Sequence, residues 1–145
     1  MARKLKVKFQ KQAAITITRN ALQADRLVYV ATASKKLRYQ FGKSSIVYIG
    51  TTKNGVHRIA SSAASKAEPL LTAHGIRHLE FYVVTCSTQQ AVKTWRKLER
   101  ALLIRFRERF GVVPMGNKQG VNLRWKDELQ YFTYLKLDKV IDYYS

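Results

Sequence analysis

The chain has 145 residues, enough for one domain with a sizeable core and too few for two ordinary domains. It carries 27 Lys and Arg against 9 Asp and Glu, a formal charge of +18, and 46% of its residues are apolar. This apolar content excludes a disordered basic tail, and no apolar run is long enough to predict a membrane-spanning helix. The excess positive charge indicates a polyanionic partner, of which nucleic acid is the commonest.

Several features that are missing from the sequence narrow its setting. Residues 1–6 lack the apolar stretch of a signal peptide. Cys86 is the only cysteine, which excludes an internal disulfide and a cysteine zinc site. Residues 42–44 imitate the end of a phosphate-binding Walker loop, but Leu37 stands where its first glycine is required. We therefore expect a cytoplasmic protein with no membrane partner and no nucleotide cofactor.

The N-terminal third is predicted to form strands. Residues 3–17 alternate between apolar and basic side chains, which predicts one or two strands, or a hairpin, within a basic arm over residues 1–24. The lysines of this arm either contact phosphates or discourage strand pairing. Residues 27–31 and 46–50 are short apolar runs that predict two paired central strands. The connection between them is expected to be a solvated loop, and its cations are candidate nucleic-acid contacts: Lys35, Lys36, Arg38 and Lys43.

Two helices and a third strand are predicted next. Asn54 is a candidate N-cap for a helix over about 56–66, and Pro69 interrupts its pattern. Residues 78–86 alternate in part and predict the third strand. A long helix is then expected over residues 88–110, ended by Gly111.

The C-terminal residues predict a late strand over 131–137 and a short helix over 138–144. We therefore expect a single α+β domain with a small antiparallel central sheet of about three strands flanked by helices. Residues 25–118 would form its core and residues 119–145 a C-terminal extension.

One carboxylate of the long helix lies on the wrong face. At about 100° per residue, the apolar side chains of the helix gather on one side, and Glu99 falls among them, one turn from Trp95 and from Leu103. An unpaired buried carboxylate costs several kcal/mol or shifts its pKa. Glu99 therefore needs a buried Arg, a hydrogen-bond network or a metal ion, and a purely structural ion pair is an equally good explanation.

The other acids form no metal cluster in the sequence, and the arginines of the long helix have two interpretations. The other acids fall in apparent loops, on exposed faces or in the C-terminal segment, without the convergent carboxylates of a two-metal nuclease. The arginines of the long helix are expected to form a solvated face, with contact to a DNA backbone as the alternative: Arg100, Arg105, Arg107 and Arg109.

An ordered set of residues resembles the GIY-YIG nuclease family. Val-Tyr-Val at 28–30 is followed by Tyr-Ile-Gly at 48–50, by Arg58 on the next helix, by Glu99 and by Asn117. The resemblance spans residues 27–118. It implies a sheet flanked by helices and an endonuclease that hydrolyses DNA phosphodiester bonds. The first motif departs from the family, because it reads Val-Tyr-Val rather than Gly-Ile-Tyr.

The resemblance also implies roles for individual residues. Tyr29 and Tyr48 would position the attacking water and contact the scissile phosphate, and Arg58 would steady its negative charge. Glu99 would bind one divalent ion, Mg²⁺ or Mn²⁺. Asn117 would support the site.

Three side chains are candidates for the general base that takes a proton from the attacking water: Tyr29, Tyr48 and His57. A tyrosine with a pKa near 10 is a poor base unless a cation lowers that pKa, and Arg58, Lys53 or the metal would do so. His57, next to Arg58, is the rival base.

Two functions remain from the sequence: a metal-dependent endonuclease and a non-catalytic basic nucleic-acid-binding protein. Glu99 separates them, because a carboxylate beside a phosphate would only weaken a binder. Substrate selection would fall to the N-terminal arm, the basic connection or residues 119–145, where Arg124 and Lys126 are candidate DNA contacts. Because one site cuts one strand, double-strand cutting would require a homodimer or sequential nicks.

Overall fold

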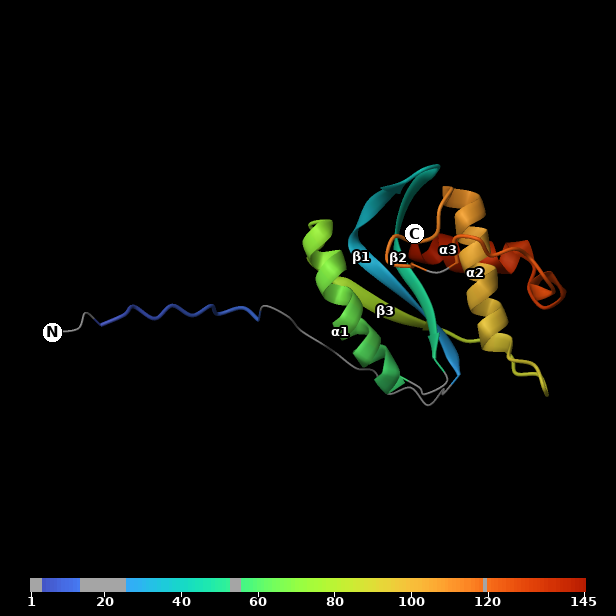
Figure 1. Cartoon of the computed structure of the whole chain (residues 1–145), viewed down its shortest axis with the longest axis horizontal. Helices are drawn as coiled ribbons and strands as arrows, with labels where there is room; N and C mark the ends of the chain where they lie inside the picture. Colours follow the sequence, from blue (N-terminus) through green and yellow to red (C-terminus); the bar gives the residue numbers. More distant parts are fainter. Residues whose placement is uncertain (1–3, 14–25, 53–55, 119) are drawn as a thin grey trace.

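The computed structural model describes residues 4–13, 26–52, 56–118 and 120–145, and it leaves out the side chains of 56–58, 60, 62–64 and 73. The fold is α+β, as predicted: a three-stranded antiparallel sheet in the order β2-β1-β3 packs with three α-helices (Figure 1). None of the described helices is long and apolar enough to cross a membrane.

The central hairpin is longer than predicted. β1 (Leu27–Tyr39) and β2 (Gly42–Thr52) pair almost to their shared turn, so the solvated loop expected between residues 31 and 46 is wrong. The register passes from Thr32 opposite Ile46 to Leu37 opposite Ser44, so the extra residues of β1 bulge outward. Beyond the bulge Leu37 and Tyr39 are buried, and this packing keeps the polar segment in the sheet.

The first helix also exceeds its predicted length. α1 (Val56–Ala73) continues through Pro69, so the end predicted near residue 66 is wrong. A proline inside a helix removes one backbone hydrogen bond. Leu70 is 5% exposed and belongs to the main core, and burial of this last turn offsets the lost bond. β3 (Leu79–Val84) then pairs with β1, close to the predicted third strand.

The second helix begins later than predicted and ends where predicted. α2 spans Thr94–Phe110, whereas residues 85–93 are irregular and Ala91 has a φ of 60°, which no right-handed helix accommodates. At the other end Gly111 takes a φ of 87°, and its N–H donates to the Arg107 carbonyl.

The C-terminal segment is part of the core. A short 3-10 turn (Glu128–Gln130) precedes α3 (Tyr134–Tyr144), so the predicted late strand over 131–137 is wrong. The Thr133 side chain accepts a hydrogen bond from the Lys136 N–H and starts the helix. Leu137 and Ile141 are then buried in the main cluster, so the extension is not a separate appendage.

The N-terminal arm shows no strand where it is described. Residues 4–13 follow an extended path without a β assignment, and the rest of the expected hairpin lies outside the described residues. Leu5, Val7 and Phe9 are exposed there. Their alternation with lysines predicted a strand, but within residues 4–13 no apolar surface covers them.

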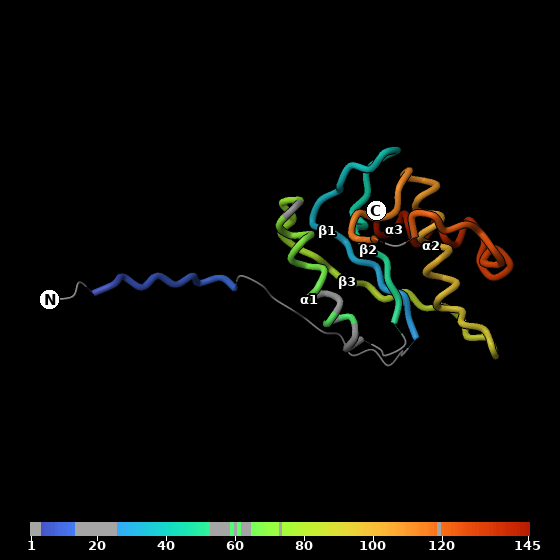
Figure 2. Tube along the Cα trace, in the orientation of Figure 1, coloured from blue at the N-terminus to red at the C-terminus, as the bar shows by residue number. Residues whose placement is uncertain are grey.

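The helices lie on both faces of the sheet. α1 covers one face, and α2 and α3 lie on the other (Figures 1 and 2). The α2 face holds the main core, whereas a smaller cluster includes Leu27, Tyr29 and Ile59, with Tyr48 and Phe81 packed against it. Both motif tyrosines therefore belong to the cluster beneath α1.

Candidate functional site

The sheet brings the two motif tyrosines together. Tyr29 of β1 lies opposite Gly50, and Tyr48 of β2 lies opposite Ala31, which makes the tyrosines diagonal neighbours on one face. Their ring centroids are 5.7 Å apart and their planes are inclined by 32°. Tyr29 is buried and Tyr48 half-buried, so Tyr48 is the more exposed of the two residues.

Gly50 makes this close approach possible. A Cβ at this position would lie 2.6 Å from Cε1 of Tyr48 and 2.7 Å from the Tyr29 hydroxyl oxygen. Both distances are far below contact distance, so only glycine leaves room for the two rings. The Tyr-Ile-Gly spacing therefore has a packing cause in this chain.

Glu99 is a half-buried carboxyl with a raised pKa. Burial raises that pKa to about 7, and the positive charges of Arg96 and Arg100 oppose the rise without cancelling it. Trp95 and Leu103, one turn away on either side, are both buried. None of the ion pairs between described side chains includes Glu99.

The structural ion pair that could have explained Glu99 occurs at another acid. Glu128 is 1% exposed, and its carboxylate accepts a hydrogen bond of 2.7 Å from Nε of Arg100. It also accepts the backbone N–H of Lys126 at 2.7 Å. From the sequence, Glu128 was counted only among the acids of loops, exposed faces or the C-terminal segment, and this burial was not predicted. Nothing in its neighbourhood in the sequence marks it, because its burial depends on the packing of residues 124–131 against α2.

Tyr48 is coupled electrostatically to Glu99. Burial raises the pKa of Tyr48 well above its ordinary value of 10, and the Tyr29 hydroxyl and the negative charge of Glu99 raise it further. Tyr48 therefore keeps its proton at neutral pH and acts as a hydrogen-bond donor. The charge of Glu99 on α2 therefore reaches Tyr48 of β2, as the smallest of these contributions.

Asn117 fixes the outer edge of β2 beside Tyr48. Its side-chain oxygen accepts the Ile49 N–H at 2.9 Å, and its amide nitrogen donates to the Ile49 carbonyl at 2.8 Å. The Gly116 N–H donates to the Val47 carbonyl at 2.7 Å. Residues 116–117 thus occupy backbone groups of β2 that would otherwise be unpaired at the sheet edge.

The basic candidates of this site are only partly placed. Lys53 lies outside the described residues; His57 and Arg58 fall in the first turn of α1, and their side chains lie outside them as well. Lys66, which the sequence reading missed, has its Nζ 5.0 Å from the centroid of the Tyr48 ring. The sequence holds one indication of this position, because Lys66 follows Arg58 by two successive i+4 steps and so lies on the same side of a helix.

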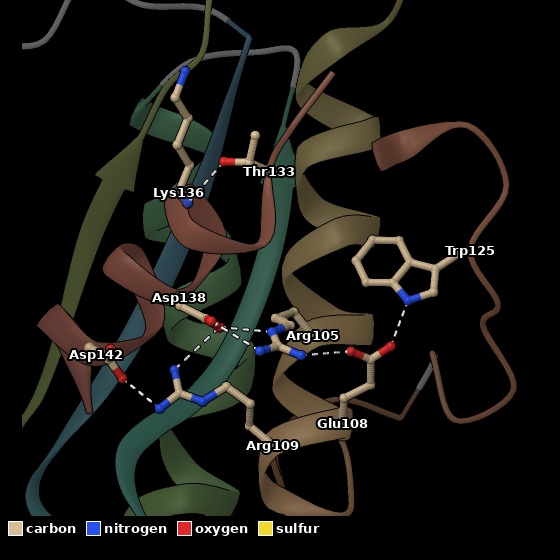
Figure 3. Close-up of polar contacts among 8 residues, drawn as sticks. All are labelled: Arg105, Glu108, Arg109, Trp125, Thr133, Lys136, Asp138 and Asp142. Atoms are coloured by element: carbon tan, nitrogen blue, oxygen red, sulfur yellow. Dashed lines mark hydrogen bonds and ion pairs between the residues drawn. The ribbon is translucent and has the colours of Figure 1, made fainter. Parts of the chain in front are cut away.

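The predicted arginine row of α2, which is Arg100, Arg105, Arg107 and Arg109, does not form a free basic face, and Figure 3 shows the partners of Arg105 and Arg109. Arg105 donates from Nε and one terminal nitrogen to the two carboxylate oxygens of Asp138, at 2.8 and 3.0 Å. Arg109 pairs with Asp142 at 2.5 Å. Arg107 donates to the carbonyls of Gly120, Val121 and Leu123. The solvated-face and DNA-backbone interpretations of this row are both replaced by a structural one, since these side chains anchor the C-terminal segment.

The other predicted nucleic-acid contacts are exposed, and none belongs to an ion pair among the described side chains. Those of the hairpin lie on strands rather than in a loop: Lys35, Lys36, Arg38 and Lys43. Arg124 and Lys126 lie in the turn region that packs against α2.

Among the described residues, Glu99 is the one candidate that the sequence analysis offered as a ligand for a divalent ion. The described residues include no group of three or more His, Cys, Asp or Glu side chains that could hold a metal. Glu99 supplies one carboxylate whose charged form is destabilised by burial, and a cation beside it would relieve that cost. Mg²⁺ is commonly bound by one or two carboxylates with water and phosphate oxygens completing its shell.

Comparison of the chain with protein-family models, curated proteins and solved structures found no match. The function proposed below therefore depends on the residues and geometry of the site itself.

Proposed function

We propose that the protein is a metal-dependent endonuclease that hydrolyses DNA phosphodiester bonds at the site of Tyr29, Tyr48 and Glu99. The observation that carries this proposal is Glu99. It is a half-buried carboxyl without an ion-pair partner among the described side chains, and its negative charge contributes to the raised pKa of Tyr48. The order of motif residues resembling the GIY-YIG family supports the same activity.

Glu99 would hold one Mg²⁺ or Mn²⁺ ion, with water and phosphate oxygens as the other ligands. When bound, the ion would stabilise negative charge that develops on the phosphate oxygens and the leaving oxygen. Arg58 would add a second positive charge from the first turn of α1. These two charges favour the transition state over the ground state, because the negative charge grows during the reaction.

The two tyrosines would have different roles in the reaction. Tyr48 keeps its proton at neutral pH, so it would donate a hydrogen bond to a phosphate oxygen and not accept a proton from water. Tyr29 and His57 are then the candidate proton acceptors. Lys66 over the Tyr48 ring would hold that ring in place and bring a positive charge toward the substrate.

The competing function is a basic nucleic-acid-binding protein without catalysis. Net charge does not separate the two, because both functions need phosphate contacts that weaken with salt. Glu99 does, since a binder gains nothing from a carboxylate that repels the phosphate. We therefore favour the nuclease.

A cleavage assay tests the proposal. Purified protein is expected to nick or cut plasmid DNA with Mg²⁺, and Glu99→Gln is expected to reduce the rate by at least about 10²–10³-fold. Salt-sensitive DNA binding by this variant should stay close to that of the natural chain. Glu68→Gln is the matched control, because it makes the same substitution at an exposed acid of α1. Equal cleavage by both variants would remove Glu99 from the mechanism.

Arg58→Ala tests the second charge. If Arg58 stabilises the transition state, the cleavage rate should fall far more than the affinity for DNA. A parallel fall of rate and affinity would make Arg58 only a tether for the substrate.

A further inference from the structure

The end of the β1–β2 hairpin is a basic feature that the proposed chemistry does not use. We name the outer side chains of its turn and adjoining strands, Arg38, Phe41 and Lys43, the hairpin tip. All three are exposed, and Phe41 is 65% exposed. Figure 1 shows the hairpin projecting beyond the rest of the sheet, near the C-terminal end of α2.

Contacts with the C-terminal end of α2 hold the backbone of the hairpin tip in place. The Phe41 N–H donates to the Phe110 carbonyl at 3.1 Å, and a Cβ at Gly111 would lie 2.7 Å from Cβ of Gln40. The inner side chain of Tyr39 packs edge-on against Phe106, with ring centroids 5.1 Å apart. The outer side chains are therefore presented by a fixed backbone, which lowers the entropy lost when they bind a ligand.

The charge of the tip is not compensated within the hairpin. Arg38 and Lys43 are register partners, so two like charges lie directly opposite each other on one face, which is destabilising in a sheet. No Asp or Glu occurs in the sequence between Asp25 and Glu68. Among the described side chains neither cation forms an ion pair. Such a pair gains stability when a polyanion binds both charges.

The exposed aromatic indicates how that polyanion is held. Phe41 leaves most of its ring in water, which is unfavourable for an apolar side chain. DNA-bending proteins insert such apolar side chains between base pairs from the minor groove while flanking cations hold phosphates. We propose that the hairpin tip is a duplex-DNA contact in which Arg38 and Lys43 bind backbone phosphates and Phe41 wedges into the minor groove. This inference deepens the proposed function and rests on DNA as its substrate.

Binding to a short DNA duplex in the presence of a chelator tests the phosphate contacts without cleavage. The slope of log affinity against log salt concentration should become shallower by about 2 in the double variant R38Q/K43Q, because two phosphate contacts are lost. The control is K136Q/K139Q, which removes the same charge from exposed positions of α3. Equal changes of slope in the two double variants would overturn the proposal.

Insertion of Phe41 into the minor groove is tested separately, by the bending of the DNA. Fluorescence energy transfer between dyes at the two duplex ends should report a kink with the natural chain, and F41A should abolish that kink while the salt slope stays unchanged. A kink that persists in F41A, or tighter binding to an A-form RNA duplex than to DNA, would overturn the proposal. Because none of these readouts involves cleavage, a protein that binds in this way but never cuts would refute the nuclease alone.

Discussion

On the α2 side of the sheet, Arg100, Arg105 and Arg109 each pair with a carboxylate of the C-terminal segment. At the hairpin tip, in contrast, Arg38 and Lys43 are exposed and form no ion pair with a described side chain. The same residue types thus serve two purposes. Arginine with a carboxylate partner joins parts of the fold, whereas a cation without one is available to a ligand.

The comparison also locates the net charge. Five acids form ion pairs with Lys97, Arg100, Arg105 and Arg109 of α2: Glu108, Asp127, Glu128, Asp138 and Asp142. The stretch from residue 26 to residue 67 has cations and no acid. These eight Lys and Arg residues give the stretch +8 of the net charge of +18, and we expect its exposed cations to attract DNA.

Removing an ion pair between α2 and the C-terminal segment should lower the free energy of unfolding. Glu128→Gln removes the buried partner of Arg100 and is expected to lower the free energy of unfolding by about 3 kcal/mol. Asp142→Asn, at an exposed acid of the same interface, should lower it by less than about 0.5 kcal/mol. Urea denaturation measures both changes. If the two variants lose equal stability, burial of the Arg100–Glu128 pair is not what anchors the C-terminal segment.

The tyrosine pair should be sensitive to a single methyl group. Gly50→Ala is expected to lower the free energy of unfolding by about 2 kcal/mol, because the new Cβ meets both rings. Gly42→Ala is the control, since its Cβ would lie 3.5 Å from the Phe110 ring, an ordinary contact. Thermal denaturation distinguishes the two. A Gly50→Ala protein of natural stability and cleavage rate would contradict the close packing of Tyr29 and Tyr48.

A small change in stability is expected when Lys66 is replaced. Lys66→Gln removes a cation–π contact worth about 0.5 kcal/mol at such a partly exposed position. Cleavage should nevertheless slow several-fold, because the Tyr48 ring loses its partner from α1. A variant that loses stability but cleaves normally would place Lys66 with the structural cations of the α2 side.

The fold was largely readable where apolar patterns are strong. Three strands, the helix end at Gly111 and the α+β class all follow from local periodicity and turn residues. The hairpin, the helix through Pro69 and the start of α3 did not, because each depends on burial of a few side chains against distant elements, such as Leu70 and Leu137 in the main core. Such tertiary packing overrides local propensity and leaves no local signal.

Part of the candidate site could also be predicted from the sequence. The residues Tyr29, Tyr48, Glu99 and Asn117 could be selected by motif order and by the helical face of one carboxylate. The partnership of Arg100 with Glu128 could not, because it joins two segments 28 residues apart. Lys66 was missed because helical spacing alone does not distinguish it from other surface lysines.

The protonation of the Glu99 carboxyl decides whether the proposed site can hold a metal ion. Its ¹³C NMR signal, assigned by its loss in Glu99→Gln, should titrate with a pKa of about 7 and not the ordinary 4.5. Between these values the folded state holds the proton more tightly than the unfolded state, so this group's contribution to stability falls as pH rises. Mg²⁺ should lower the midpoint, because the ion favours the charged form. A midpoint near 4.5, or one that Mg²⁺ leaves unchanged, would contradict a buried carboxylate that binds a metal.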